Sequence, residues 1–549
     1  MEDELDRFDL AVEQAAAGVR ELANRLRSSG PRAQASILEA YVAMVEDESL
    51  REAVERAIRD DLQCAEWALD SAVSQMADQL RATGDPYLAE RSHDFEFVGD
   101  RILRALMGRQ LPIPLVPALE EACILVAHDL SPAETAALSK DRVKAIVTEV
   151  GTRTSHTAIL ARALEIPAVV GVRRITAMIA SGEKLVVDGQ RGRVIISPTA
   201  AMIDTARARA ARQQALAAGL REGRREPARL RCGERVDLLA NLELPGEADV
   251  ALEQGAQGVG LYRTEFLYIA RAEPPSEDEQ YAVYRHVVER MAPLPVVLRT
   301  FDIGGDKFAS AFQAPAEMNP ALGLRAVRLG LAHPELLLTQ LRAMVRASAH
   351  GTVSVMVPMV SALEELRAVR ELLSRAVKQV DQTGEPRAAE IPLGVMIEVP
   401  AAALLADQFA READFFSIGT NDLIQYCLAV DRTNQELAYL ASPFHPAILG
   451  LIRRVVEAAE RHHRAVSVCG AMASDPAAAA VLVGLGLRQL STETSSVLEV
   501  KAALARISRE EARAVAERAL ECLTTTEAEQ VVQQGLAPYL GDLFEVDAD

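Results

Sequence analysis

One histidine of the chain stands where a phosphate group could be carried. In the segment VGTRTSHTAILARALEIPAVVG (residues 150–171), Thr154 and Ser155 are suited to cap a helix, and apolar residues recur after them at helical spacing. This pattern places His156 in the first helical turn, where unpaired backbone N–H groups and the helix dipole stabilise an anion, including a phosphate on the imidazole. An ordinary surface histidine near a helix cap fits the same pattern, so this segment alone leaves both interpretations open.

A second set of residues follows short apolar runs in the second half of the chain. These residues stand at the ends of predicted strands: Asn241, Arg263, Glu265, Arg299, Asp302, Pro358, Glu398, Asn421, Asp422, Cys469 and residues 491–493. The adjoining loops DIGGDK and DRTN add Lys307 and Arg432. Because an arginine fork donates two parallel hydrogen bonds to a carboxylate or a phosphate, the set predicts a small substrate with several negative charges. The alternative is a ring of surface ion pairs around a barrel.

Two carboxylates of this set suggest a metal. Glu398 and Asp422 match the usual magnesium arrangement, in which one or two acidic side chains share the ion with waters and substrate phosphate oxygens. We therefore expect Mg²⁺ at these two residues.

Four regions that differ in composition and in the pattern of apolar residues would position these residues. Residues 1–110 are almost free of proline and periodic, which predicts a helical bundle, and residues 111–200 alternate short apolar runs with turns, which predicts a small α/β domain that carries His156. Residues 201–230 predict a helical linker. Residues 231–549 alternate strand-like and helix-like runs. The fold class that follows is a multidomain α/β protein.

The strand-like runs of the last region number eight. They read VDLLANL, GVGLYRT, VVLRTFD, VSVMVPM, LGVMIEVP, FFSIGTN, AVSVCG and QLSTE. Eight β/α alternations over roughly 300 residues predict a (β/α)₈ TIM barrel, whose active site lies at the C-terminal ends of the strands. No histidine stands at such an end, so His156 must cross the linker region to meet the arginines. The small domain is therefore expected to swivel.

The composition of the chain limits which binding partners and which cell compartment we expect for it. The chain has 549 residues, a formal net charge of −20 and a hydrophobic fraction of 49%. This charge argues against nucleic acid as a partner, and the absence of a run of about 20 apolar residues argues against membrane insertion. The acidic start MEDELDRFDL has no apolar core segment, so we expect a cytoplasmic protein. The six cysteines form no CxxC pair, so the sequence indicates neither a disulfide framework nor a zinc site.

The motifs together resemble one family over nearly the whole chain. The stretches GTRTSHTAILAR, GLYRTEFLY, RTFDIGGDK, IEVPAA, FFSIGTNDLIQYCLAVDR and VCG occur here in the same order as in Enzyme I of the bacterial sugar phosphotransferase system, the phosphoenolpyruvate-protein phosphotransferases. The resemblance implies transfer of phosphate from phosphoenolpyruvate to a histidine of the enzyme, then to a histidine phosphocarrier protein, with release of pyruvate.

The resemblance also implies individual roles. It implies that His156 is the phosphorylated histidine and that Cys469 handles the proton on the enol carbon. It assigns the binding of phosphoenolpyruvate to Arg263, Arg299, Asn421 and Arg432. We add the loop residue Lys307 and Asp422 to this substrate-binding set. The resemblance assigns the binding of magnesium to Glu398 and Asp422. It implies that the N-terminal helices dock the carrier, HPr or a relative, and that the barrel forms a homodimer.

Three positions depart from the family pattern. The chain opens in a helical segment where the family has a strand rich in glycine and serine-proline. Ala471 stands where the family usually has a glutamate after the Cys469–Gly470 pair, so a carboxylate near the thiol is absent, and Thr152 replaces a glycine.

Two alternatives remain beside this interpretation. A pyruvate phosphate dikinase or phosphoenolpyruvate synthase shares the histidine domain and the barrel, but it needs a large nucleotide domain, and the first 110 residues contain no glycine-rich phosphate loop. A non-catalytic regulator is suggested by the altered start and by Ala471, although the residues assigned to phosphate transfer are all present.

Overall fold

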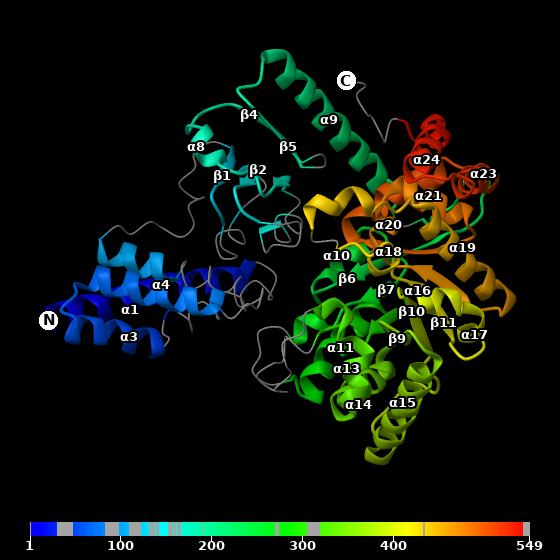
Figure 1. The fold of residues 1–549 in the computed structure, drawn as a ribbon, viewed down its shortest axis with the longest axis horizontal. Coiled ribbons are helices and arrows are strands. Elements are labelled where there is room, and N and C mark those ends of the chain that lie inside the picture. The colour runs from blue at the N-terminus through cyan, green and yellow to red at the C-terminus, as the bar shows by residue number, and fades with distance from the viewer. Residues whose placement is uncertain are drawn as a thin grey trace. The chain divides into compact units, whose positions relative to one another are not determined.

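The computed structural model of the protein describes residues 2–29, 45, 48–82, 98–108, 122–130, 138, 142–151, 157–158, 161, 166–189, 192–224, 226–268, 274–304, 319–431 and 434–541. They form two compact units, residues 1–213 and residues 214–549 (Figure 1). The boundary between the units falls inside α9 (Ala200–Glu222). A helix is therefore present where the sequence predicts the linker.

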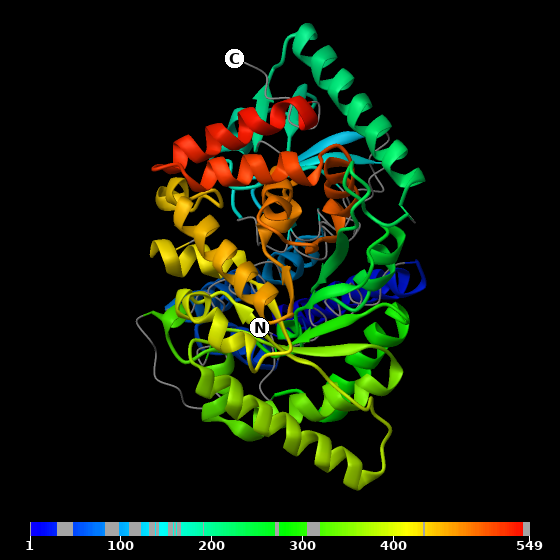
Figure 2. The ribbon, with the colours of Figure 1, turned by 90° about the vertical axis from the view of Figure 1, so that its right-hand side faces the viewer.

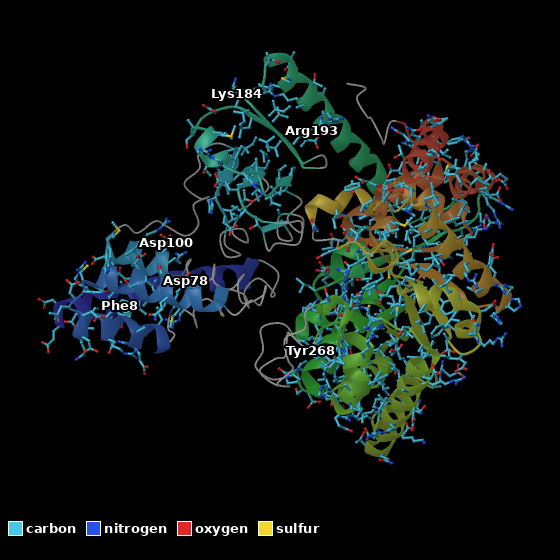
Figure 3. The ribbon with its side chains drawn as sticks, viewed as in Figure 1. Phe8, Asp78, Asp100, Lys184, Arg193 and Tyr268 are labelled. Carbon is cyan, nitrogen blue, oxygen red and sulfur yellow. The ribbon has the colours of Figure 1, made fainter. Side chains whose placement is uncertain are left out.

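The chain begins with helices that pack on one another. They are α1 (Glu2–Ser29), α3 (Glu48–Asp60), α4 (Ala65–Ala82) and the helical residues 98–106. Each turns an apolar stripe inward, as the periodicity of the sequence predicts, and Phe8, Leu50, Leu69 and Ile102 are fully buried between them. Figure 3 labels Phe8 among these helices. The predicted helical character of this region is confirmed.

The rest of the first unit is the small α/β part. It consists of β1 (Cys123–Ala127), β2 (Val143–Thr148), β3 (Ala168–Val169), α8 (Ile175–Met178), β4 (Leu185–Asp188) and β5 (Arg193–Ile196). Strands β1, β2 and β3 form a parallel sheet, and β4 and β5 form an antiparallel pair, beside which Figure 3 labels Lys184 and Arg193. All five strands lie within the predicted apolar runs. The helix start predicted around His156 lies outside the described residues.

The second unit is built on a closed parallel barrel. Its strands are β6 (Asp237–Leu242), β7 (Val259–Tyr262), β8 (Val296–Arg299), β9 (Val353–Val357), β10 (Leu393–Ile397), β11 (Phe415–Ile418), β12 (Ala465–Val468) and β13 (Gln489–Glu493). Each pairs with the next along the chain, and β13 closes the barrel against β6. The predicted TIM barrel is confirmed, strand by strand.

Helices surround the barrel (Figure 2). They are α10 (Glu247–Glu253), α11 (Glu277–Met291), α13 (Ala326–Ala332), α14 (Pro334–Ala347), α15 (Leu363–Thr383), α16 (Pro400–Leu404), α17 (Ala406–Ala410), α18 (Thr420–Leu428), α19 (Pro446–Arg461), α20 (Ala471–Ser474), α21 (Pro476–Gly484) and α22 (Val497–Ala505). Two further helices, α23 (Arg509–Leu520) and α24 (Thr525–Leu540), run side by side after the last strand. Several begin at capping boxes, such as Ser276 with Glu279 at α11, which satisfy the first backbone N–H groups.

The barrel carries two apolar layers because side chains alternate along each strand. The outer layer packs strands against helices and forms the large core of the unit. The inner layer fills the lumen with Leu261, Met356, Met396 and Cys469, against which Val297 and Phe415 pack. Two methionines and a cysteine thus occupy a lumen in which branched residues usually dominate.

The end of the linker helix is fastened to the barrel unit. Lys501 on α22 donates from Nζ to the carbonyl oxygens of Gly223 at 2.7 Å and Arg224 at 3.3 Å, and also to that of Glu226. These carbonyl groups directly follow the last residue of α9, Glu222, and a cation close to a helix C-terminus is favoured by the helix dipole.

Among the residues that the structure describes, none belongs to a helix that is both long and apolar enough to span a membrane.

Candidate active site

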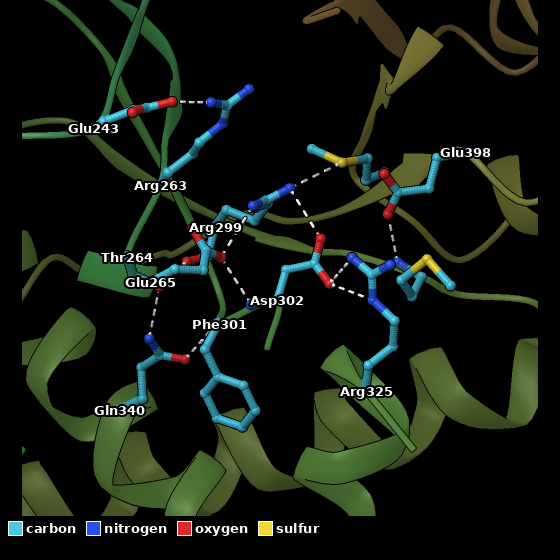
Figure 4. A network of polar contacts seen from close by, with 12 residues as sticks. Glu243, Arg263, Thr264, Glu265, Arg299, Phe301, Asp302, Arg325, Gln340 and Glu398 are labelled. Atoms are coloured by element: carbon cyan, nitrogen blue, oxygen red, sulfur yellow. Dashed lines mark hydrogen bonds and ion pairs between the residues drawn. The ribbon is translucent and has the colours of Figure 1, made fainter. Parts of the chain in front are cut away.

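Predicted site residues gather at the C-terminal mouth of the barrel. Arg299 ends β8, Arg263 follows β7, and Glu398 follows β10 (Figure 4). Cys469 follows β12, and Asp422 lies in the first turn of α18, directly after β11. Because the strands are parallel and consecutive, their carboxyl ends meet at one mouth.

Arg299 is the buried cation of this mouth. Its guanidinium is 2.9 Å from Glu265 Oε1 and 3.3 Å from Asp302 Oδ2, and it contacts Met396 Sδ at 3.8 Å. Burial alone would lower the pKa of Arg299, but the carboxylates of Glu265, Asp302 and Glu398 outweigh burial and shift it upward. Arg299 is therefore a fixed positive charge at the top of the lumen.

Arg325 is a residue of this site that the sequence reasoning missed. It precedes α13, and it donates from Nε and Nη2 to Asp302 Oδ1 at 3.0 and 2.7 Å and from Nη1 to the Tyr426 hydroxyl at 3.1 Å. Asp302 thus joins Arg299 and Arg325 in one network (Figure 4). A guanidinium has five N–H donors, so two remain after these three bonds.

A buried polar web holds the ends of β7 and β8 in place. The Thr264 hydroxyl donates to the carbonyl of Arg299 at 3.0 Å, and Gln340 Nε2 donates to the Thr264 hydroxyl at 3.1 Å and to the Tyr284 hydroxyl at 3.0 Å. The backbone N–H of Phe301 donates to Gln340 Oε1 at 3.0 Å. Gln340 is fully buried, so these bonds fix the backbone from the carbonyl of Arg299 to the N–H of Phe301.

Arg263 lies nearer the rim. Its Nη1 donates to Glu243 Oε1, and both side chains are partly exposed. An exposed pair of this kind contributes little to stability, so Arg263 can exchange Glu243 for an anionic ligand at small cost.

Glu398 is buried at the opposite side of the mouth. Its Oε1 accepts a hydrogen bond at 2.6 Å from the backbone N–H of Met359, a residue held at φ +58°, while its Oε2 has no partner among the described residues. A side chain at position 419 would come within 2.7 Å of this Oε2, so Gly419 leaves it room. Burial, and then the carboxylates of Asp422 and Asp302, raise the pKa of Glu398 well above its ordinary value.

Asn421 and Cys469 adjoin through the turn that follows β12. Asn421 Oδ1 accepts a hydrogen bond at 2.9 Å from the N–H of Ala471, the first residue of α20. A Cβ at position 470 would lie 1.7 Å from Thr420 Oγ1, so only glycine lets this turn pack against α18. The turn therefore needs Gly470 directly after the cysteine.

Cys469 faces the lumen and is almost fully buried. Burial raises the pKa of its thiol to about 11, while the Ser417 hydroxyl works in the opposite direction. The thiol is therefore protonated at neutral pH, as a proton donor has to be.

Three predicted site residues lie outside the described residues: His156, Lys307 and Arg432. Their roles remain predictions.

The described part of the site holds more carboxylates than arginines, which favours a bound cation. With every carboxylate ionised, as a bound cation would favour, three arginines face five carboxylates and two negative charges are left over: Arg263, Arg299 and Arg325 against Glu243, Glu265, Asp302, Glu398 and Asp422. Carboxylate oxygens such as the unpartnered Oε2 are the ligands that Mg²⁺ prefers. The described residues contain no group of three or more His, Cys, Asp and Glu side chains placed to hold a metal. Two carboxylates with waters or substrate oxygens would suffice, so the residues present fit the expected ion.

Three family models match the chain. The N-terminal model of PEP-utilising enzymes covers residues 1–91, the mobile-domain model covers residues 119–192 and the PEP-binding-domain model covers residues 217–509. The match to an N-terminal model covers the region in which the chain opens in helix.

Curated relatives match over almost the full length. Phosphoenolpyruvate-protein phosphotransferases of Bacillus sp. (strain S) and Bacillus subtilis (strain 168) are each 40% identical to the chain and cover 97% of it, and 92% and 93% of their own lengths are covered. A solution structure of an Enzyme I protein (nEIt) is 34% identical and covers 39% of this chain and 85% of that one, with a TM-score of 0.34.

Proposed function

Because the chain belongs to the phosphoenolpyruvate-protein phosphotransferase family, we propose that it moves the phosphoryl group of phosphoenolpyruvate to its own His156 and then to an HPr-like phosphocarrier, releasing pyruvate. This reaction is the first step of the sugar phosphotransferase system. The single observation that carries the proposal is the 40% identity over 97% of the chain. The dikinase or synthase alternative is not favoured, because the curated relatives named above are phosphotransferases of nearly this length.

The described arginines would bind the substrate. Arg299 and Arg325, held by Asp302, present fixed positive charge to the phosphate and carboxylate of phosphoenolpyruvate, and Arg263 leaves Glu243 to join them. Asn421, in the first turn of α18 after β11, adds an amide side chain that can hydrogen-bond the substrate. Lys307 and Arg432 add positive charge from the adjoining loops.

Glu398 and Asp422 would hold a magnesium ion. Bound there, the ion supplies charge stabilisation for the phosphoryl group during transfer. Glu398 is positioned for this role by the N–H of Met359, which fixes one carboxylate oxygen and leaves the other available. Asp422 adds a second carboxylate from α18.

The acceptor would come from the other unit. His156 stands on the N-terminal side of α9 and the arginines on its C-terminal side, so transfer requires the small α/β part to approach the barrel mouth and then leave it. Once phosphorylated, His156 meets the carrier, which we place on the N-terminal helices.

Cys469 would complete the chemistry. Loss of the phosphoryl group leaves the enolate of pyruvate, and the thiol S–H gives its proton to the methylene carbon, which forms the methyl group and leaves a thiolate. The protonated state of the buried thiol suits this step.

The setting of the enzyme is also part of the proposal. We place it in the cytoplasm as a homodimer joined through the barrel, without nucleic acid and without insertion into a membrane.

The test is transfer of label from phosphoenolpyruvate carrying ³²P in the phosphate. The wild-type chain should acquire acid-labile label without ATP, and His156→Ala should acquire none, whereas the isolated barrel from residue 231 should still bind phosphoenolpyruvate. Label that requires ATP would favour the dikinase, and no label in the wild-type chain would favour a non-catalytic regulator. Acid-labile label on His156→Ala would disprove the assignment of the acceptor.

A further inference from the structure

Two oppositely charged residues meet where β6 and β7 end. The register of these strands pairs Leu242 with Tyr262. Glu243 and Arg263 directly follow this pair, one on each chain segment, at the substrate mouth of the barrel. The backbone N–H of Arg263 donates to the carbonyl of Leu242 at 2.9 Å, which holds the two segments together. The backbone therefore places Glu243 and Arg263 next to each other.

The backbone of Glu243 is also held from its C-terminal side. Glu247 lies in the first turn of α10, and its Oε2 accepts hydrogen bonds from the backbone N–H of Glu243 at 2.6 Å and from that of Leu244 at 3.0 Å. Two bonds to one oxygen keep the connection between β6 and α10 in a single shape. Glu243 is thus fixed in its place beside Arg263.

The side chains of this pair bind each other, and their contact differs from those of the other two arginines of the site. Arg263 Nη1 donates to Glu243 Oε1 (Figure 4). Arg299 and Arg325 instead share Asp302. The side chain of Asp302 is 4% exposed, whereas that of Glu243 is 48% exposed. The partner of Arg263 can therefore move into solvent, and the shared partner of the other two arginines cannot.

An exposed carboxylate on a substrate-binding arginine competes with the substrate. The guanidinium of Arg263 must give up its bond to Glu243 before the same N–H group can donate to a phosphate or carboxylate of phosphoenolpyruvate. The released carboxylate of Glu243 then remains close to the bound anion and repels it. Both effects weaken binding, although an exposed ion pair is weak enough for the substrate to displace it.

We propose that Glu243 is an internal competitor of phosphoenolpyruvate, which holds Arg263 before the substrate arrives and thereby sets how tightly the substrate binds. The proposal rests on the proposed function, in which Arg263 binds phosphoenolpyruvate. A substrate anchored by Arg299 and Arg325 draws Arg263 away from Glu243, and Arg263 returns to Glu243 when the ligand leaves. The described site thus combines two arginines that have permanent partners with one whose partner is exchangeable.

The test is the dissociation constant of phosphoenolpyruvate, measured by isothermal titration calorimetry with Mg²⁺ present. The parent protein is full-length His156→Ala, which should bind the substrate and cannot accept its phosphoryl group. Glu243→Gln keeps the size of the side chain and removes its charge. An exposed ion pair is worth up to about 1 kcal/mol, a factor of about five in a dissociation constant, so this variant should bind about threefold to fivefold more tightly. The gain should shrink between about 30 mM and about 500 mM KCl, because salt screens an exposed pair.

Two further variants show whether Glu243 acts through Arg263. In an Arg263→Gln background the partner is gone, so most of the gain from Glu243→Gln should disappear. Glu457→Gln removes the same charge from another exposed pair, Glu457 with Arg453 at 3.0 Å on α19, and it should leave the dissociation constant unchanged. Where binding is too weak for calorimetry, KM in pyruvate formation by chains with His156 intact gives the same comparison.

Three results would each overturn the competitor. They are an unchanged dissociation constant in Glu243→Gln, an equal gain from Glu243→Gln in the Arg263→Gln background, and an equal gain in Glu457→Gln. Absence of phosphoenolpyruvate binding to the parent protein, together with absence of pyruvate formation by the wild-type chain, would instead overturn the proposed function.

Discussion

Arg325→Lys is the sharpest test of the site because it keeps the charge and changes only the geometry. Three of the five N–H groups of Arg325 are bonded to Asp302 and Tyr426, so two remain to bind the substrate. A lysine has three donors in all, and the bond to Asp302 occupies at least one of them. The variant should therefore keep the ion pair with Asp302 and lose the planar contact with phosphoenolpyruvate.

The size of the effect follows from the bonds lost. A hydrogen bond to a charged group contributes about 1.5 kcal/mol at the low end, so two bonds amount to about 3 kcal/mol. A tenfold change in rate corresponds to about 1.4 kcal/mol, so kcat/KM for phosphoenolpyruvate should fall about 100-fold. Stability should change little, because the buried carboxylate of Asp302 keeps a cationic partner.

The assay is formation of pyruvate coupled to lactate dehydrogenase, with an HPr-type carrier present, at varied phosphoenolpyruvate. The matched control is Arg328→Lys, three residues further along in α13, since Arg328 donates to the carbonyl groups of Leu322 and Gly323 and contacts no acidic side chain of the described site. Arg328→Lys should retain wild-type kcat/KM. A decrease of less than fivefold in Arg325→Lys, or an equal decrease in both variants, would refute the reasoning.

Three other predictions concern the metal, the thiol and the supporting web. Glu398→Ala and Asp422→Ala should each abolish magnesium-dependent turnover, since the cation loses a hard oxygen ligand, and wild-type rates across a magnesium titration would rule the site out. Cys469→Ala should slow formation of pyruvate far more than it weakens binding of phosphoenolpyruvate, and unchanged deuterium incorporation into the methyl group would contradict this. Gln340→Leu should lower the free energy of unfolding by about 2 kcal/mol, because the buried N–H of Phe301 loses its acceptor; denaturant unfolding measures it, and a change below 0.5 kcal/mol would contradict the role of the web.

The strands could be predicted because each strand of the barrel corresponds to a recognisable apolar run in the sequence. A strand buried on both faces needs a continuous apolar run, and all eight runs became strands of the barrel. The same regularity located Arg299 and Glu398, since the polar residue that ends each run must lie at the mouth.

Residues away from the strand ends could not be found in this way. Arg325 lies far along the chain from the end of β8, and its backbone bridge to Gly304 and its bonds to Asp302 and Tyr426 place it at the mouth. The partner of Glu398 is a backbone N–H of Met359, whose side-chain type carries no signal of the role.

The fastening of the linker helix by Lys501 turns α9 into a lever with one fixed end. Its 23 residues make it about 35 Å long at 1.5 Å per residue. A rotation of about 10° at the fixed end therefore displaces the far end by about 6 Å, so a small change of angle beside the barrel produces a large travel of whatever the helix carries. The lysine bonds three carbonyl groups in the segment that follows α9, so one side chain on α22 helps to hold this end. We expect that substitution of that side chain would loosen this end of α9 without removing any residue of the described site.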